Sequence, residues 1–202
     1  MKPISFISPS RNNLTYLKWM YNSIRKNVGY YHEILLADDC SEDGTWEWLQ
    51  EIQKKDPNVK IHRNEGPTRL GHTILYDTLV NDYSTNDIVM IYHADMYACP
   101  GLDVEINKHI KKGVVVSGTR IEPPLHPEGP EKILHDYGIE PEEFKEYDLL
   151  RDYETFKKDE RQRQNNRGYL CAVGYNERRL SIYRRTRPIV CSTIKRRFRY
   201  IQ

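Results

Sequence analysis

The segment 87–100 (DIVMIYHADMYACP) constrains the fold of this chain more than any other. Its residues 88–92 form an apolar, β-prone run that stops at His93-Ala94-Asp95, and Pro100-Gly101 then breaks the chain. Such a run is typical of a buried parallel strand. The strand would deliver the Asp95 carboxylate to the C-terminal edge of its sheet, where ligands bind in open α/β folds.

Asp95 has two interpretations. A hard divalent cation that holds a diphosphate needs an oxygen ligand on a rigid element, and Asp95 would supply it at this edge. Alternatively, Asp95 only caps the turn that follows the strand. His93 lies two residues earlier, on the same side of an extended chain, so it would face the same ligand.

Strands and helices alternate along the first 117 residues. We expect strands at 4–8, 33–37, 59–63, 88–92 and 114–117, and helices at 15–26, 45–55, 68–80 and 102–111. This alternation predicts an α/β fold with a mostly parallel sheet built from βαβ units. Residues 121–130 hold four prolines and are expected to form a loop. Residues 131–158 are expected to be helical in two pieces, split at Pro141.

Two adjacent carboxylates, Asp38 and Asp39, follow the second predicted strand. They cannot both be core residues, because burying an unpaired charge is costly. One of them could accept hydrogen bonds from the imide of a uracil or from ribose hydroxyls. The alternative is that both cap the next helix. Because Asp95 would end another strand of the same sheet, a ligand site is favoured.

Two further segments could contact a nucleotide. The loop 8–13 follows a buried strand and could enclose a base or a phosphate, or it is an ordinary turn. It contains neither GxGxxG nor GxxxxGK[ST], so a Rossmann dinucleotide site and a P-loop are unsupported. Arg69, near the start of the third helix, could pair bidentately with a diphosphate, or it is a solvated surface residue.

The composition is that of a single soluble domain. The chain has 202 residues, of which 38% are hydrophobic and 30% charged, and no apolar run approaches the ~20 residues of a membrane span. The start, MKPISFIS, does not resemble a signal peptide. The four cysteines, at positions 40, 99, 171 and 191, have no CxxC spacing. We expect free thiols in a reducing compartment and a cytoplasmic protein.

These residues resemble the family-2 glycosyltransferases, which have the GT-A fold of nucleotide-diphospho-sugar transferases. ISFISPSRNN looks like the family's first strand and base-binding loop. LLADDCSEDGT is similar to its DDxSxDGT motif, which is the most specific match. NEGPTRLGHTILYDTLV looks like its third loop and helix, and YHADM stands in the place of its DxD motif. The resemblance runs continuously over residues 3–120 and more loosely to about 158.

The resemblance implies a nucleotide-sugar donor, often a UDP-sugar, bound with Mg²⁺ or Mn²⁺. It also implies inverting transfer to the hydroxyl of a glycan or another acceptor; nucleic acid is not the expected partner. By position, the resemblance implies that Pro9 and Arg11 line the base pocket. It implies that Asp39 hydrogen-bonds the base and that Asp38 supports it. It also implies that Arg69 lies near the nucleotide and that Asp95 coordinates the metal.

Two features depart from the family. His93 stands where many members have the first Asp of DxD. A histidine ligates Mn²⁺ better than Mg²⁺, and the expected metal ligands are Asp95 and His93.

Inverting members also need a carboxylate general base near the acceptor. No convincing match follows residue 120, because Glu142-Glu143 and Asp159-Glu160 read as solvated helix carboxylates. The catalytic base is therefore unassigned.

The C-terminal segment 161–202 is strongly basic. It contains eleven Arg and one Lys against one Glu, a net +11, so the remaining chain carries −9 of the total +2. Read one base later, with suitable synonymous codons, residues 165–202 become a sequence with a GGHD turn and a KEDSDIF acidic motif. That sequence resembles the family's acceptor half.

We therefore expect a GT-A nucleotide-sugar-binding domain over residues 1–160 and an out-of-frame tail over 161–202. The acceptor half would then be truncated or frameshifted and the catalytic base lost. An alternative is a non-catalytic nucleotide-sugar-binding fragment. In a further alternative the tail is genuine, and its Arg, Tyr and Phe residues bind nucleic acid or an anionic surface.

Overall fold

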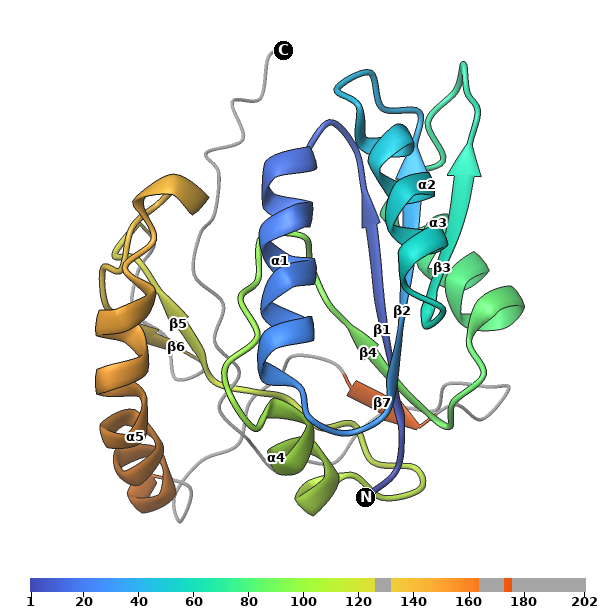
Figure 1. Cartoon of the computed structure of the whole chain (residues 1–202). Coiled ribbons are helices and arrows are strands. Elements are labelled where there is room, and N and C mark those ends of the chain that lie inside the picture. The colour runs from blue at the N-terminus through green and yellow to red at the C-terminus, as the bar shows by residue number, and fades with distance from the viewer. Residues whose placement is uncertain (126–131, 164–172, 176–202) are drawn as a thin grey trace.

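The main sheet has five strands in the order β3-β2-β1-β4-β7 (Figure 1). The computed structural model describes residues 1–125, 132–163 and 173–175. The strands are β1 (Ile4–Ser10), β2 (His32–Asp39), β3 (Val59–Asn64), β4 (Ile88–Ile91) and β7 (Val173–Tyr175). The first four are parallel, and β7 pairs with β4 antiparallel. The expected mostly parallel α/β sheet is confirmed.

Helices cover both faces of this sheet. They are α1 (Leu14–Asn27), α2 (Thr45–Lys55), α3 (Gly71–Thr78) and α4 (Leu102–His109); a further helix, α5 (Glu146–Arg163), lies apart from the sheet. One hydrophobic cluster joins the sheet to α1, α2 and α4, and a separate one joins the opposite face to α3. Strand side chains alternate between the two faces: Phe6 belongs to the α1 cluster and Ile7 to the α3 cluster.

A smaller layer lies beside α1. In it, β5 (Arg120–Glu122) and β6 (Lys132–Leu134) pair in parallel, and α5 lies alongside them (Figure 1). Buried Ile121, Tyr137 and Leu149 form a third cluster, against which Trp19 of α1 packs. This cluster fixes the layer to the outer side of α1.

The helix and strand predictions hold best in the first 111 residues. The helix expected at 45–55 coincides with α2, whereas the helix expected at 68–80 begins only at Gly71 and continues into a π-helical turn, Leu79–Tyr83. The strand expected at 114–117 is wrong, because those residues belong to no strand and β7 occupies the place beside β4.

Three predictions between residues 121 and 158 need correction. Residues 121 and 122 belong to β5, although a loop was expected there. In the region expected to be helical, Lys132–Leu134 instead forms β6, because its Ile133 packs into the third cluster beside β5. A short 3-10 turn, Pro141–Glu143, precedes α5, which begins at Glu146. Of the two helical pieces expected, the described residues contain only the second, so the expected split of a helix at Pro141 is wrong.

The chemistry of the cysteines also differs from expectation. Cys40 is a free thiol, but Cys99 is disulfide-bonded, so the prediction of free thiols is wrong there. Cys171 and Cys191 lie outside the described residues.

None of the helices in the described ranges combines the length and the apolar character needed to cross a membrane.

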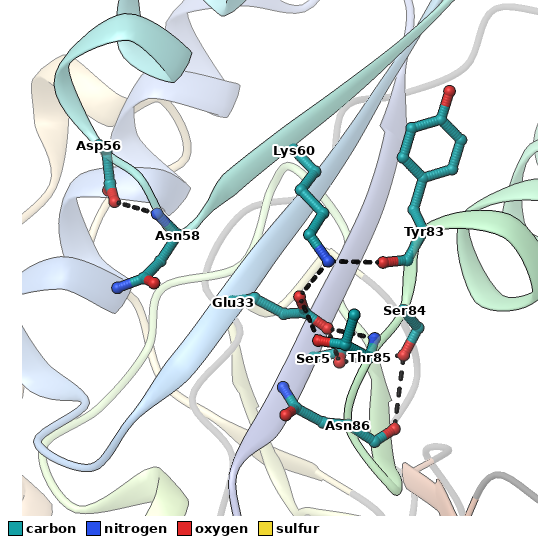
Figure 2. A network of polar contacts seen from close by, with 9 residues as sticks. All are labelled: Ser5, Glu33, Asp56, Asn58, Lys60, Tyr83, Ser84, Thr85 and Asn86. Atoms are coloured by element: carbon teal, nitrogen blue, oxygen red, sulfur yellow. Dashed lines mark hydrogen bonds and ion pairs between the residues drawn. The ribbon is translucent and has the colours of Figure 1, made fainter.

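A buried carboxylate ties four segments together at the amino end of the sheet. Glu33 of β2 accepts hydrogen bonds from the Ser5 hydroxyl and from the Thr85 backbone N–H and hydroxyl (Figure 2). Lys60 Nζ lies 2.8 Å from Glu33 Oε2. Burial raises the pKa of Glu33, but the bonds from Lys60, Ser5 and Thr85 outweigh it, so the pKa lies below its ordinary value.

We predict that Glu33→Gln lowers the free energy of unfolding by about 1–3 kcal/mol at pH 7, because an amide nitrogen would face other donors. Because the folded pKa is depressed, this stability is present above the unfolded pKa of about 4.3 and is lost as the pH falls through the folded value. Urea denaturation across this pH range measures both effects.

Glu51→Gln is the matched control, because Glu51 pairs with Lys55 at the exposed surface. It should leave the urea midpoint unchanged. Equal midpoints for the Glu33→Gln variant and the wild type at pH 7 would show that the Glu33 contacts contribute no net stability.

Candidate functional site

The predicted nucleotide-binding residues gather at the carboxyl ends of β1 and β2, mostly on one face. Ile7 and Ala37 pack against α3. Strand alternation places Pro9, which follows Ile7, and Asp39, which follows Ala37, on that same α3 face; Arg11 lies in the bend directly after β1. Pro9 pairs with Ala37 in the strand register, which puts it two positions from Asp39 along β2.

Asp39 binds the N-terminus of α3. Its Oδ2 accepts the backbone N–H of Gly71 at 3.0 Å, and its Oδ1 accepts that of Leu70 at 3.0 Å. The Asn64 side chain, at the end of β3, donates to Oδ1 at 2.7 Å. Since the first N–H groups of a helix lack intrahelical partners, this carboxylate satisfies two of them and faces the positive end of the helix dipole.

These contacts keep Asp39 ionised although it is only 3% exposed. Burial raises the pKa of the carboxyl group. The hydrogen bonds from Asn64, Leu70 and Gly71, with the charge of Arg69, outweigh burial and hold the pKa below its ordinary value. At neutral pH Asp39 is therefore a hydrogen-bond acceptor only.

Asp38 lies on the opposite face of the sheet. It is fully buried, its Oδ1 accepts the Ser41 N–H at 3.1 Å, and its Oδ2 lies 3.8 Å from Arg63 Nε. The Arg63 guanidinium in turn lies over the Trp46 ring, 5.1 Å from its centroid. These contacts fix the loop after β2, so Asp38 is not brought together with Asp39. The capping alternative is also inaccurate for Asp39, which caps α3 rather than α2.

The two predicted arginines follow β1 and precede α3, and Arg69 is the one in contact with Asp39. Arg69 precedes α3, its side chain is 57% exposed, and its Nε lies 3.9 Å from Asp39 Oδ2. Arg11 is half-buried, and its buried Nε makes no hydrogen bond to any residue in the described ranges. Two cationic groups therefore lie at this edge, where an anionic ligand could pair with them.

His93 and Asp95 follow β4. His93 is exposed, and its ring centroid lies 6.4 Å from that of Tyr76 on α3. Tyr76 also stacks with His72 at 6.3 Å. His93 is thus held beside the α3 face, as Pro9 and Asp39 are. Asp95 lies half-buried in the turn two residues later.

A divalent cation fits these residues only with help from a ligand. Across residues 1–125, 132–163 and 173–175, no group of three or more His, Cys, Asp or Glu side chains could hold a metal ion. His93 and Asp95 offer one imidazole and one carboxylate. Mg²⁺ in nucleotide sites is commonly held by one or two carboxylates together with phosphate oxygens. The donor set therefore fits a cation that arrives with a diphosphate.

A separate hollow lies beside the N-terminus of α1. Its volume is about 460 Å³, and Asn13, Asp43, Glu140 and Glu142 are among the residues that line it. None of the predicted site residues belongs to it. The carboxylates make this hollow unsuitable for a diphosphate, because like charges repel.

Sequence reasoning missed the partners of Asp39. Asn64 ends a strand, and the Leu70 and Gly71 N–H groups open α3, but these positions are 25 to 32 residues away. One signal was available: period-two alternation puts adjacent strand residues on opposite faces, which separates Asp38 from Asp39.

Comparisons with known proteins agree with this fold. A sequence profile described as "Glycosyl transferase family 2" matches residues 5–180. The chain is 28% identical over 111 residues to a dolichol-phosphate mannosyltransferase of Pyrococcus furiosus, covering 54% of this chain and 30% of the relative.

Two solved structures share the fold. S. aureus TarS 1-349 in complex with UDP-GlcNAc has a TM-score of 0.52 at 21% identity, covering 64% of this chain and 37% of TarS. GalNAc-T7 with UDP, GalNAc and Mn²⁺ has a TM-score of 0.52 at 19% identity, covering 59% of this chain and 23% of that protein. The chain therefore spans between 23% and 37% of the length of these three proteins.

We predict that Asp39→Ala lowers the free energy of unfolding by about 1–2 kcal/mol, because the first N–H groups of α3 lose their acceptor. Amide hydrogen exchange should accelerate in α3 and not in α1. Arg69→Gln is the control, since it keeps the cap, and it should leave both measurements unchanged. Unchanged exchange in α3 of the Asp39→Ala variant would contradict the capping role.

Proposed function

We propose that this chain, which belongs to glycosyl transferase family 2, binds a UDP-sugar. In this proposal the sugar is transferred to an acceptor hydroxyl with inversion at the anomeric carbon. The carrying observation is the buried Asp39, with Arg69 near it, at the carboxyl edge of the sheet where β1 ends after Pro9 and before Arg11. TarS and GalNAc-T7, which share the fold, are described with UDP-GlcNAc and with UDP. Their ligands support a uridine nucleotide as the donor.

In the proposed complex each residue has a distinct role. Asp39 accepts a hydrogen bond from the base, Pro9 and Arg11 line the base pocket, and Asp38 holds the loop behind it. Arg69 pairs with the diphosphate, which gains charge as the sugar departs. Asp95 and His93 would hold a divalent cation, Mn²⁺ or Mg²⁺, which supplies further stabilisation of that charge.

The acceptor hydroxyl must lose a proton as it attacks the anomeric carbon. We assign no general base for this step. Glu142 and Glu143 are exposed on the turn before α5, as expected for solvated carboxylates. In this proposal the described residues serve donor binding, and the general base and the acceptor contacts are unassigned.

We retain the proposal that the donor domain spans residues 1–160 and that 161–202 is an out-of-frame tail. Most of the tail, including all of 176–202, lies outside the described residues. Sequencing the coding DNA through the codons for 150–202 and onward tests the proposal directly. An extra base, or an open shifted frame beyond 202, supports it; a confirmed frame with stop codons in the shifted reading contradicts it.

A genuine basic tail has a different signature. It would bind nucleic acid or anionic vesicles with an affinity that falls steeply as the salt concentration increases.

A chain with an out-of-frame tail would bind the donor or hydrolyse it slowly. Sugar transfer by this chain at ordinary enzymatic rates would contradict the loss of the acceptor half.

The donor site is tested by calorimetric titration of the full chain with UDP in excess Mn²⁺. We predict that Asp95→Asn weakens UDP binding about tenfold or more, because the cation loses its carboxylate ligand. Asp87→Asn is the matched control: it changes an exposed aspartate at the other end of β4 and should bind UDP as the wild type does. Equal affinities for all three proteins would remove Asp95 from the site.

The histidine at the metal position gives a separate prediction. His93→Asp should increase UDP affinity in Mg²⁺ relative to that in Mn²⁺, because Mg²⁺ prefers oxygen ligands to imidazole. The ratio of the two dissociation constants measures this shift. An unchanged ratio would mean that His93 does not contact the cation.

A further inference from the structure

His32, the first residue of β2, is a buried histidine whose two ring nitrogens both contact polar groups. The residue is 7% exposed, and the Phe6 ring of β1 packs against its ring with 5.6 Å between the centroids. Its Nδ1 lies 2.7 Å from the carbonyl oxygen of Tyr30, and its Nε2 lies 2.5 Å from Nη1 of Arg25 in the last turn of α1. This pair lies at the amino end of the sheet, whereas the proposed donor site lies at the carboxyl end.

The two contacts determine the protonation state of the His32 ring. A carbonyl oxygen only accepts hydrogen bonds, so Nδ1 carries a proton and donates it to Tyr30. A guanidinium group only donates, so Nε2 accepts from Arg25 through its lone pair. Only the neutral imidazole with its proton on Nδ1 can make both contacts. A second proton, on Nε2, would break the hydrogen bond from Arg25 and place two positive charges in contact.

Other partners hold Arg25 in this position. Its Nε lies 2.6 Å from Oδ2 of Asp56, which directly follows α2. The Tyr21 hydroxyl donates to the same carboxylate oxygen at 2.8 Å, and the guanidinium lies over the Tyr21 ring, 5.7 Å from its centroid. The guanidinium is therefore fixed against the His32 ring by contacts that do not depend on His32.

Burial is the strongest influence on the pKa of His32 and lowers it, and the charge of Arg25 lowers it further. The hydrogen bond to the Tyr30 carbonyl and the charges of Asp103 and Asp56 act in the other direction. Asp103, on α4, is itself buried and accepts the Tyr30 backbone N–H at 2.8 Å. The lowering influences prevail, so the pKa of His32 lies below its ordinary value.

We propose that His32 and Arg25 form a pH-sensitive latch, which holds the last turn of α1 against the start of β2 at neutral pH and releases it in mildly acidic solution. Asp56 brings the end of α2 to the same guanidinium, so three segments of the chain meet at the latch. Because the folded pKa of His32 is depressed, the stability that the latch contributes is present above the unfolded pKa of about 6.5. It is lost as the pH falls from there through the folded value.

The direct test is an NMR titration of the full chain that follows the ring nitrogens of its histidines. His32 should show the Nδ1–H tautomer at pH 7 and should take up a proton at a lower pH than His72, which is exposed. Arg25→Met keeps an unbranched side chain but removes the guanidinium, so it should raise the pKa of His32. An Nε2–H tautomer in the wild type, or titration of His32 at or above the pH of His72, would overturn the latch.

Urea denaturation and amide hydrogen exchange at pH 7.5 and pH 5.5 measure the release itself. In the wild type the urea midpoint should fall, and protection in the last turn of α1 should decrease severalfold, by no more than about tenfold per pH unit because one proton is taken up.

His32→Asn can still donate to the Tyr30 carbonyl but cannot be protonated, so its midpoint should change less between the two pH values. His72→Gln is the matched control and should keep the wild-type pH dependence. An equal fall in midpoint for the wild type and His32→Asn would overturn the latch. The tautomer and the titration of the wild type test the proposal without either variant.

Discussion

Two carboxylates buried on one face of one strand govern the arrangement of this domain. Glu33 and Asp39 lie near the two ends of β2, and each would destabilise the fold if its charge were unpaired. At the amino end, Glu33 binds side chains of β1 and β3 and the backbone before β4. At the carboxyl end, Asp39 accepts hydrogen bonds from the end of β3 and from the start of α3. The start of α3, which borders the proposed ligand site, is held by the second of these charges.

The fold was predictable where each element carries its own signal. Between residues 4 and 111, apolar runs and helical periodicity are local, so strands such as β2 and helices such as α2 could be found from the sequence. The failures are elements that depend on distant partners. The segment 114–117 has strand-forming residues, but β7 takes the place beside β4. Lys132–Leu134 is too short to carry a pattern and becomes a strand by pairing with β5.

The position of the candidate site residues on the sheet was predictable from the sequence, but their contacts were not. Carboxylates after two parallel strands indicate the carboxyl edge of the sheet, and Asp39 does lie there with Pro9, Arg11 and Arg69 nearby. Which donors hold Asp39 could not be predicted, because two of the three are backbone groups whose position depends on the start of α3. Asp38 could have been separated from Asp39, because neighbouring strand residues face opposite sides. The positions of His93 and Asp95 relative to a bound cation depend on the ligand as well as on the chain.

A carboxylate at a helix N-terminus is usually a structural cap, so its use in recognition needs a physical reason. Capping fixes Asp39 in one orientation and lowers its pKa, which leaves a rigid, permanently ionised acceptor at the sheet edge. A ligand that binds such a group does not have to immobilise it, and less conformational entropy is lost on binding. Asp38 is equally buried, but its neighbours are Arg63 and the following loop. The capping role of Asp39 is therefore compatible with the proposed recognition role, because both need the same fixed, ionised carboxylate.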